Sequence, residues 1–411
     1  MLKLYFSLIF AFCLISSSLG QSIEVCKNCD VKTLTEAIFI AKPHDKITVQ
    51  KGIYNEHDIV IDKPLKIIGK EHPVIDGEKK GYVLIIKSDS VHISGLVVKN
   101  PGQSYTKDYA AIYVSRSNHF IIENSILENV FFGMLIEKSH EGLVKNNHIS
   151  SNAINQASSG NGIHLWHCSN ILIEKNEVNN LRDGIYLEFV ENSNIINNKS
   201  HHNLRYGLHF MFSNHNEYRN NVFKNNGAGV AVMFSKFIKM THNTFAENWG
   251  TASYGLLLKE IYDAEIENNI FQENTIGINV EGSTRINYVK NNFSSNGWAI
   301  KIAGACYTNK FYQNNFLNNS FDISYNSKLN DNEFKTNYWS SYTGYDLDKN
   351  GFGDIPYRPV KLFSYVVNKT PETIVLLRSL FVDIINFSEK VSPVFTPDNL
   401  MDSSPLMKPV K

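Results

Sequence analysis

The stretch "GLHFMFSNHN", residues 207–216, is followed by the related stretch "GVAVMFSKF", residues 229–237, and their first glycines are 22 positions apart. Small residues recur at nearly this spacing in both directions along the chain. The series is Ala111, Gly133, Gly162, Gly184, Gly207, Gly229, Gly255, Gly277 and Ala299. A sustained period of this length indicates stacked structural repeats. The longer interval between Gly133 and Gly162 indicates a loop insertion in that repeat.

The residues after each glycine alternate, as in "IHLW", "IYLE", "LHFM" and "VAVM", with apolar first and third positions. A period of two is typical of a strand with one buried face. We expect about three short strands per repeat, each paired in parallel with the next coil. The expected inward residues are Ile163, Leu165, Ile185, Leu187, Leu208, Phe210, Val230 and Val232. The predicted fold class is all-β, a right-handed parallel β-helix.

A second marker keeps the same period, an asparagine in the turn between strands. Its positions are Asn124, Asn147, Asn176, Asn198, Asn221, Asn243, Asn269, Asn291, Asn314 and Asn332. We expect each side-chain amide to bond its neighbours in the coils above and below, forming a ladder.

The ends of the chain differ from the repeats. Residues 1–20 contain a short apolar run followed by small residues, which predicts a secretory signal peptide cleaved near Gly20 and an exported protein. A membrane anchor is the alternative, but the run is short. Residues 21–336 should form the β-helix and its N-terminal capping helix, and residues 337–411 a C-terminal cap, amphipathic helix and extended tail. The capping helix should bury Leu34, Ala37, Ile38 and Ala41.

Composition excludes some functions. The 40 basic and 40 acidic residues balance, which argues against a nucleic-acid partner. No P-loop sequence is present, so this chain is not expected to hydrolyse ATP, and any ATP dependence would come from a partner. The pair Cys26 and Cys29 in "CKNC" fits either a small disulfide of an oxidising compartment or a copper-binding pair.

Soft side chains are expected on one outer face of the β-helix. Alternation turns His209, Met211 and Met233 outward on adjacent coils, with His164 two coils earlier. Two thioethers and an imidazole favour Cu(I), so we interpret these four residues as a transient copper site. The alternative is a protein-docking patch, because exposed Met and aromatic side chains commonly mark interaction surfaces.

The C-terminal cap holds a second candidate. "DLDKNGFGD" places Asp346, Asp348, Asn350 and Asp354 at the spacing of a calcium loop, although Tyr357 stands where a closing Glu is usual. A polar turn without metal would explain the same residues.

The coils "NGIHLWHCSN", "DGIYLEFVENS" and "YGLHFMFSNHN", the cap "NYWSSYTGYDLDKNGFGDIPYRP" and the ending "LMDSSPLMKP" resemble the NosD family. That family consists of periplasmic, non-catalytic accessory proteins for copper-site assembly in nitrous oxide reductase. The resemblance implies an ABC transporter permease with its ATPase, a copper chaperone lipoprotein and nitrous oxide reductase as partners. It leaves open whether sulfur is also carried. Membrane contact would come through a partner, with segments 373–387 and 391–411 as candidates for the permease contact. A cap that covers the last coil is the alternative for these segments.

Two other functions stay open at this point. β-Helices also serve as polysaccharide lyases and hydrolases, which need paired carboxylates or a basic residue beside bound calcium. Glu188, Lys259 and Glu281 face outward, but Met211 and Met233 should separate Glu188 from Lys259. An exported adhesion or scaffold protein would need neither metal nor catalysis.

Overall fold

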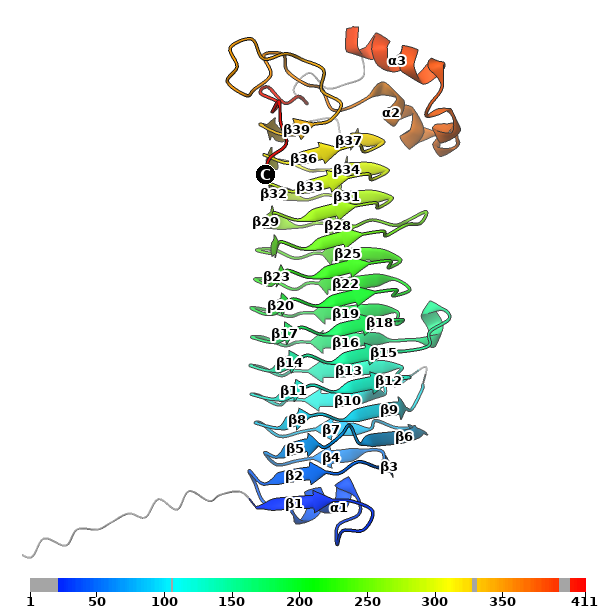
Figure 1. Cartoon of the computed structure of the whole chain (residues 1–411), viewed down its shortest axis with the longest axis vertical. Helices are drawn as coiled ribbons and strands as arrows, with labels where there is room; N and C mark the ends of the chain where they lie inside the picture. The colour runs from blue at the N-terminus through cyan, green and yellow to red at the C-terminus, as the bar shows by residue number, and fades with distance from the viewer. Residues whose placement is uncertain (1–20, 105, 327–330, 392–399) are drawn as a thin grey trace, which may run out of the picture.

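The computed structural model, which describes residues 21–104, 106–326, 331–391 and 400–411, is one elongated parallel β-solenoid (Figure 1). Each full coil adds one short strand to each of three sheets, in the chain order sheet C, sheet A, sheet B. Every strand pairs in parallel with the equivalent strand of the neighbouring coil. The predicted parallel β-helix is confirmed.

The strands of the described residues are as follows. Sheet A contains β1 (Ser22–Val25), β2 (Lys46–Val49), β5 (Lys66–Gly69), β8 (His92–Ser94), β11 (Ile121–Glu123), β14 (Leu143–Lys145), β17 (Leu172–Glu174), β20 (Asn194–Ile196), β23 (Glu217–Arg219), β26 (Lys239–Thr241), β29 (Tyr262–Glu267), β32 (Thr284–Val289), β35 (Lys310–Tyr312) and β38 (Glu333–Lys335). Sheet B contains β3 (Ile53–Asn55), β6 (Val74–Lys80), β9 (Val97–Pro101), β12 (Ile126–Glu128), β15 (His148–Ser150), β18 (Glu177–Asn179), β21 (Lys199–His201), β24 (Val222–Lys224), β27 (Thr244–Ala246), β30 (Ile270–Gln272), β33 (Asn292–Ser294), β36 (Asn315–Leu317) and β39 (Tyr338–Trp339). Sheet C contains β4 (Ile59–Ile61), β7 (Leu84–Ile86), β10 (Ala110–Ser115), β13 (Phe132–Glu137), β16 (Asn161–Trp166), β19 (Asp183–Glu188), β22 (Tyr206–Met211), β25 (Ala228–Met233), β28 (Leu256–Lys259), β31 (Ile276–Glu281), β34 (Trp298–Ala303) and β37 (Phe321–Asn326).

The interior of the solenoid is one continuous apolar core. All eight inward residues predicted from the alternation are fully buried. Sheet B adds a stack of buried rings that the sequence interpretation did not include. It consists of Phe223, Phe245, Phe271, Phe293, Phe316 and Trp339, with neighbouring ring centroids 4.1–5.5 Å apart. Because the coils are in register, each ring packs on its equivalent one coil away.

The asparagine ladder is confirmed from Asn147 to Asn314. Each Nδ2 in this series donates to the Oδ1 of the next asparagine, as from Asn198 to Asn221 at 3.1 Å. Two predicted members were wrong. Asn124 lies outside the ladder, because Ser125 is the residue in register with Asn147 and its amide bonds Asn147 Oδ1. Asn332 belongs to a separate ladder with Asn309, and the first ladder continues from Asn314 to Asn337.

A further ladder runs in parallel and was not predicted. It consists of Asn203, Asn226, Asn248, Asn274, Asn296 and Asn319. Buried amides in these rows satisfy the polar backbone of the turns from inside, which a solenoid with tight corners requires.

The N-terminal end is capped as predicted. Helix α1 (Leu34–Ile40) starts at Thr33, whose hydroxyl accepts a hydrogen bond from the Glu36 amide at 3.2 Å. Its residues Leu34, Ala37 and Ile38 are buried against the first coil. The predicted signal peptide, residues 1–20, lies outside the described residues.

At the C-terminal end the predicted amphipathic segment 373–387 is not one helix. Helix α2 (Leu362–Lys369), a 3₁₀ turn η2 (Pro371–Leu376) and helix α3 (Leu380–Val391) follow one another beside the last coils (Figure 1). Helix α2 ends at Lys369, two residues before Pro371. Proline has no backbone N–H to donate and cannot continue the helix, which explains this break. No helix in the described part of the chain is long and apolar enough to cross a membrane.

Residues 400–411 of the predicted extended tail contain no helix and pack on the last coil. Leu400 and Asp402 are fully buried, and Leu406 donates its amide hydrogen bond to the Asn337 carbonyl at 2.9 Å. This segment therefore covers the last coil, whose open strand edges would otherwise be exposed. The remainder of the predicted tail, residues 392–399, lies outside the described residues.

Candidate functional site

The outer face of sheet C carries rows of equivalent side chains that run along the solenoid. One row holds His164, Tyr186, His209, Ala231 and Leu257 in direct register. The next row holds Trp166, Glu188, Met211, Met233, Lys259 and Glu281. The predicted order of outward residues is therefore the order in the structure.

Met211 and Met233 are register partners on the adjacent strands β22 and β25, and both are half-buried. Equivalent side chains on paired strands lie about 5 Å apart. The Tyr186 hydroxyl donates a weak hydrogen bond to the Met211 Sδ at 3.6 Å. The structure thus brings the two predicted thioethers together on one rigid face.

His209 is only 6% exposed, and its ring packs against those of Tyr186 and Tyr206, with centroids 4.6 and 4.9 Å away. Its Nδ1 lies 3.5 Å from Oδ2 of the fully buried Asp183. Both ring nitrogens are buried, and neither has a hydrogen-bond partner among the described residues. A carboxylate beside one imidazole nitrogen is the usual arrangement when the other nitrogen is a metal ligand.

Asp183 is held by Arg205, whose Nε donates to Oδ1 at 2.7 Å and whose Nη2 donates to Oδ2. Burial favours the neutral carboxyl, but the hydrogen bonds from Arg205, with His209 close by, outweigh it and hold the pKa of Asp183 below its ordinary value. The sequence interpretation missed this positioning role, because nothing in the repeat period marks Asp183 as the neighbour of His209.

His164 does not join His209. The Tyr186 ring lies between them in the row, with its centroid 4.6 Å from each imidazole centroid. Burial, with the nearby charge of Arg182, lowers the pKa of His164 to about 4, so this imidazole is neutral. The two histidines therefore sit in separate surroundings, and the predicted copper role of His164 stays a prediction.

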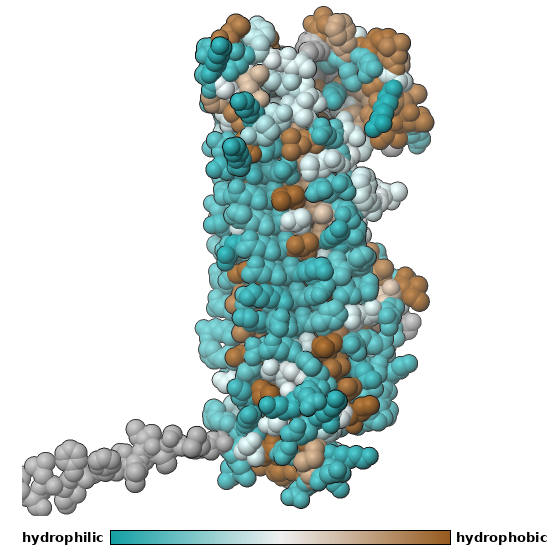
Figure 2. All heavy atoms as spheres, in the orientation of Figure 1, coloured by the Kyte–Doolittle hydropathy of each residue, from teal (hydrophilic) through white to brown (hydrophobic). Residues whose placement is uncertain are grey.

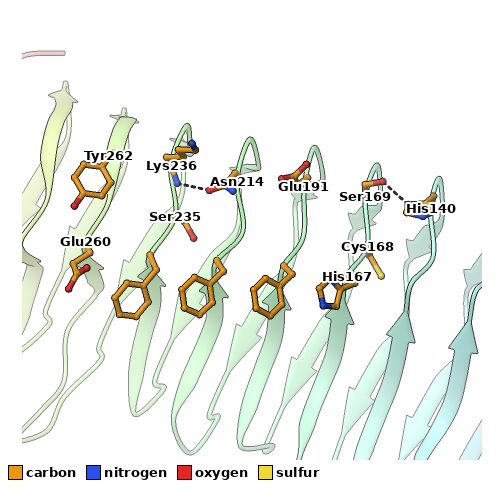
Figure 3. A pocket seen from close by; sticks show the side chains of 13 residues that line it. His140, His167, Cys168, Ser169, Glu191, Asn214, Ser235, Lys236, Glu260 and Tyr262 are labelled. Carbon is orange, nitrogen blue, oxygen red and sulfur yellow. Dashed lines mark hydrogen bonds between the residues drawn. The ribbon is translucent and has the colours of Figure 1, made fainter.

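A groove runs along the corner between sheets C and A, immediately after the methionine row (Figure 3). We call it the corner groove. One side is a stack of rings formed by His167, Phe189, Phe212 and Phe234, with centroids 4.7–5.3 Å apart and planes within 16°. The other side is polar and includes Glu191, Asn214, Lys236 and Tyr262, and the groove volume is about 880 Å³.

The backbone turn at this corner does not need an aromatic residue in order to form. His167, Phe189, Phe212 and Phe234 all have positive φ, between 50° and 53°, and the same turn in other coils carries Lys138 or Glu260. Phe189 and Phe212 are each 40% exposed. A bulky residue is unusual in this conformation, and an exposed ring adds no core packing. The repeated "MFS" was the signal in the sequence that marks this groove.

Cys168 also borders the corner groove but is buried. Its thiol donates to the Ile136 carbonyl at 3.3 Å, and burial raises its pKa to about 11. Metal ligation needs a thiolate, so this residue packs the core.

The N-terminal pair Cys26 and Cys29 forms a disulfide. The first of the two alternatives for this pair therefore holds in the structure, and the sulfurs are unavailable as copper ligands unless they are reduced.

In the candidate calcium loop, the carboxylates bond the loop itself. Asp346 accepts hydrogen bonds from the amides of Asn350 and Gly351 at 3.1 and 2.9 Å, and Asp354 accepts one from Leu347 at 2.7 Å. Asp348 accepts one from the Asn350 side chain at 2.8 Å. The contacts are those of a polar turn, and calcium binding stays a prediction.

Helix α3, at the C-terminal end of the solenoid, has an exposed apolar face, and Figure 2 shows hydrophobic residues gathered at this end. Its side chains are Leu380, Phe381, Ile384, Phe387 and Val391, and Leu380 is 73% exposed. The opposite side of α3 buries Val382 with Phe363 of α2. A contiguous exposed patch of this kind marks a contact surface for another molecule.

Comparisons with known proteins find one family and several relatives for this chain. The family model described as "Periplasmic copper-binding protein (NosD)" matches residues 145–344. Two relatives, from Pseudomonas aeruginosa and Stutzerimonas stutzeri, are each named "Probable ABC transporter binding protein NosD". The first is 25% identical over 370 residues, covering 85% of this chain and 86% of the relative. The second is 26% identical over 368 residues, covering 85% and 84%.

Solved structures with a similar fold include two alginate-modifying enzymes. The A-module of Azotobacter vinelandii mannuronan C-5 epimerase AlgE6 aligns with a TM-score of 0.46 and 10% identity, over 71% of this chain and 90% of that chain. The periplasmic alginate epimerase AlgG aligns with a TM-score of 0.45 and 14% identity, over 71% and 77%.

Proposed function

Because this chain is a member of the NosD family, we propose that it is a non-catalytic periplasmic protein that handles and delivers copper for metal-site assembly in nitrous oxide reductase. In this proposal it works with an ABC transporter, whose ATPase supplies the hydrolysis. The family description and the names of both relatives support the copper and transporter parts. Export by cleavage near Gly20 is part of the same proposal.

The observation that carries the proposal is the register of Met211 and Met233. Two thioethers side by side on a rigid sheet suit Cu(I), because soft ligands select a soft metal. His209 supplies a nearby imidazole whose Nε2 is unpartnered. Three ligands drawn from one face leave a position for a ligand from a partner, which suits a protein that passes its metal on.

The corner groove supports a docking role beside the copper site. Its phenylalanines directly follow the methionines, as Phe212 follows Met211 and Phe234 follows Met233. A partner that gives or takes copper would contact both features at once. The apolar face of α3 is the proposed contact with the transporter permease, at the other end of the described structure from α1.

A carbohydrate-active enzyme is the second candidate, and the observed rows do not favour it. Paired catalytic carboxylates would have to lie about 5–10 Å apart on one face. In the row of outward residues, Met211 and Met233 separate Glu188 from Lys259 and Glu281. Activity on pectin, alginate or hyaluronan would overturn the non-catalytic assignment.

The test is an anaerobic Cu(I) titration of residues 21–411 against a competing chelator. The unaltered chain should bind one Cu(I) tightly, and the combined change Met211→Leu and Met233→Leu should abolish that binding while preserving side-chain volume. The combined change of His209, Met211 and Met233 to Ala should do the same. Trp166→Ala, in the same row, is the control and should retain binding.

Cys26→Ser with Cys29→Ser completes the series. Binding lost only in this variant would move the site to the N-terminal end. Binding that survives both methionine variants and the cysteine variant would exclude copper ligation by all of these residues.

A further inference from the structure

The three side chains proposed to hold copper are not equally accessible. Met211 and Met233 are half-buried on the outer face of sheet C. His209 is buried, and both of its ring nitrogens are closed to solvent without a hydrogen-bond partner in the described part of the chain. A metal ion needs an entry path to its ligand atoms. The imidazole therefore has to be uncovered before it can bind Cu(I).

Two tyrosine rings cover this imidazole. The ring of Tyr186, one coil earlier on β19, stacks on the His209 ring with the centroids 4.6 Å apart and the planes 18° apart. The ring of Tyr206, on the same strand as His209, has its centroid 4.9 Å away and is tilted by 52°. Ring contacts at these separations are favourable, so the covered arrangement of the imidazole is a stable one.

The two covering rings differ in how firmly they are held. The Tyr206 ring lies 5.0 Å from the guanidinium carbon of Arg205, and two nitrogens of that guanidinium bond the buried Asp183. The Tyr206 amide also donates to Asp183 Oδ1 at 3.4 Å. Tyr186 is half-buried and is held by ring packing and by the weak hydrogen bond from its hydroxyl to the Met211 Sδ, at 3.6 Å. Tyr186 is therefore the ring that can leave the imidazole more easily.

The Tyr186 hydroxyl links the cover of the imidazole to the methionines. The Met211 sulfur that accepts its hydrogen bond is also the atom that would bind Cu(I). Burial, with the nearby negative charge of Glu188, raises the pKa of Tyr186, so the hydroxyl remains protonated and keeps its donor. A thioether is a weak acceptor, and a bound Cu(I) ion would draw electron density from it. Copper on Met211 would therefore loosen the contact that holds the Tyr186 ring over His209.

We propose that Tyr186 is a gate over the copper site, an inference that rests on the proposed copper function. Met211 and Met233 take up Cu(I) first, and the Tyr186 ring then turns away from His209, whose imidazole completes the site. When copper leaves, the ring returns and covers the imidazole again. Because the ring and the metal compete for the same two side chains, the gate favours passing the metal on over keeping it.

The first test needs no copper and measures the cover directly. Diethyl pyrocarbonate acylates accessible imidazole nitrogens, and mass spectrometry of peptides gives the rate at each histidine. In the unaltered chain His209 should react far more slowly than the exposed His202. Tyr186→Ala should raise the rate at His209 about tenfold, because the stacked ring is lost. Tyr312→Phe, which removes a hydroxyl bonded to Glu333 on sheet A, is the control and should leave that rate unchanged. Equally fast reaction of His209 and His202 in the unaltered chain would overturn the inference.

The second test is anaerobic stopped-flow transfer of Cu(I) from a coloured chelator to the protein. Tyr186→Phe keeps the ring and removes only the hydroxyl, so uptake should become about threefold faster. Tyr186→Ala should be faster still, and Tyr312→Phe should match the unaltered chain. Tight Cu(I) binding with equal uptake rates in all four proteins would overturn the gate and leave the copper function standing. Failure of the unaltered chain to bind Cu(I) would overturn both.

Discussion

Asp402 accepts hydrogen bonds from both the backbone amide and the side-chain amide of Asn337, 65 residues earlier in the chain, at 2.9 and 3.1 Å. The carboxylate occupies the place that the next asparagine of the ladder would take. It also accepts hydrogen bonds from Trp339 Nε1 at 3.0 Å and from the Thr336 amide at 3.1 Å. The C-terminal segment thereby ends a ladder that the repeats could not end by themselves.

Asp402→Ala should destabilise the protein by about 3 kcal/mol, because several buried donors would lose their acceptor at once. Urea unfolding followed by circular dichroism measures the change. Asp62→Ala, at an exposed aspartate near the N-terminal end of the solenoid, is the control and should change stability by less than about 0.5 kcal/mol. Equal stability of the two variants would show that residues 400–411 do not hold the last coil.

Asp322, buried on β37 beside the C-terminal cap, should make stability depend on pH. Burial raises its pKa from 3.8 to about 6, against the opposing charge of Lys361. The folded chain therefore keeps this proton where the unfolded chain releases it. Its contribution to stability is complete below about pH 4 and is lost as the pH rises to about 6.

Asp322→Asn is neutral at every pH and should remove this dependence. The variant should be more stable than the unaltered chain at pH 7, by up to about 3 kcal/mol, and the difference should vanish near pH 4. Unfolding free energies measured between pH 4 and 7 provide the comparison. A difference that stays constant over this range would contradict the assignment.

The cysteines predict a simple thiol count for residues 21–411. Unfolding without reductant should expose two thiols, those of Cys168 and Cys306, because Cys26 and Cys29 are joined. In the folded protein both thiols should react slowly, since they are buried and burial raises both pKa values. Four reactive thiols after unfolding would show that the N-terminal pair is reduced.

The apolar face of α3 should be needed for binding to the transporter permease, but not for folding or for Cu(I) binding. Replacing Leu380, Phe381 and Phe387 by Ser should abolish co-purification with the permease, because the exposed apolar contact area is lost. Thermal stability and Cu(I) binding should stay as they are. Ile154→Ser, at an exposed residue of the inserted loop, is the control. Undiminished co-purification would move the contact elsewhere.

Substitutions in the corner groove should change the docking of a partner without changing the stability of the fold. Changing Phe189, Phe212 and Phe234 to Lys, the residue that the same turn carries at position 138, should alter stability by less than about 1 kcal/mol. Capture of the copper-delivering or copper-receiving partner should fall at least tenfold, because the apolar edge of the groove is removed. Ile270→Lys, exposed on sheet B, is the control. Equal capture by both variants would leave the groove without a docking role.

The sequence by itself determined the solenoid, its rows and most of one asparagine ladder. Coils stacked in parallel and in register repeat each position once per turn, so a period of about 22 residues identifies neighbours in space from the chain alone. For that reason the Met211 and Met233 partnership and the inward residues such as Ile185 were predictable. Asn124 was misplaced because it precedes Ser125, the residue in register with Asn147, and Asn332 because Asn337 is the residue in register with Asn314.

The contacts that do not recur from coil to coil were decided only by the tertiary structure. The buried contact of His209 with Asp183 and the Tyr186 ring that separates His209 from His164 depend on side-chain conformations, which a strand position does not specify. The return of Asp402 to Asn337 joins segments that share no repeat. The contact of Ser151 with the Val130 carbonyl comes from a loop, residues 151–160, that breaks the repeat. Periodic packing is encoded by spacing, whereas these sites depend on contacts that each occur once in the folded chain.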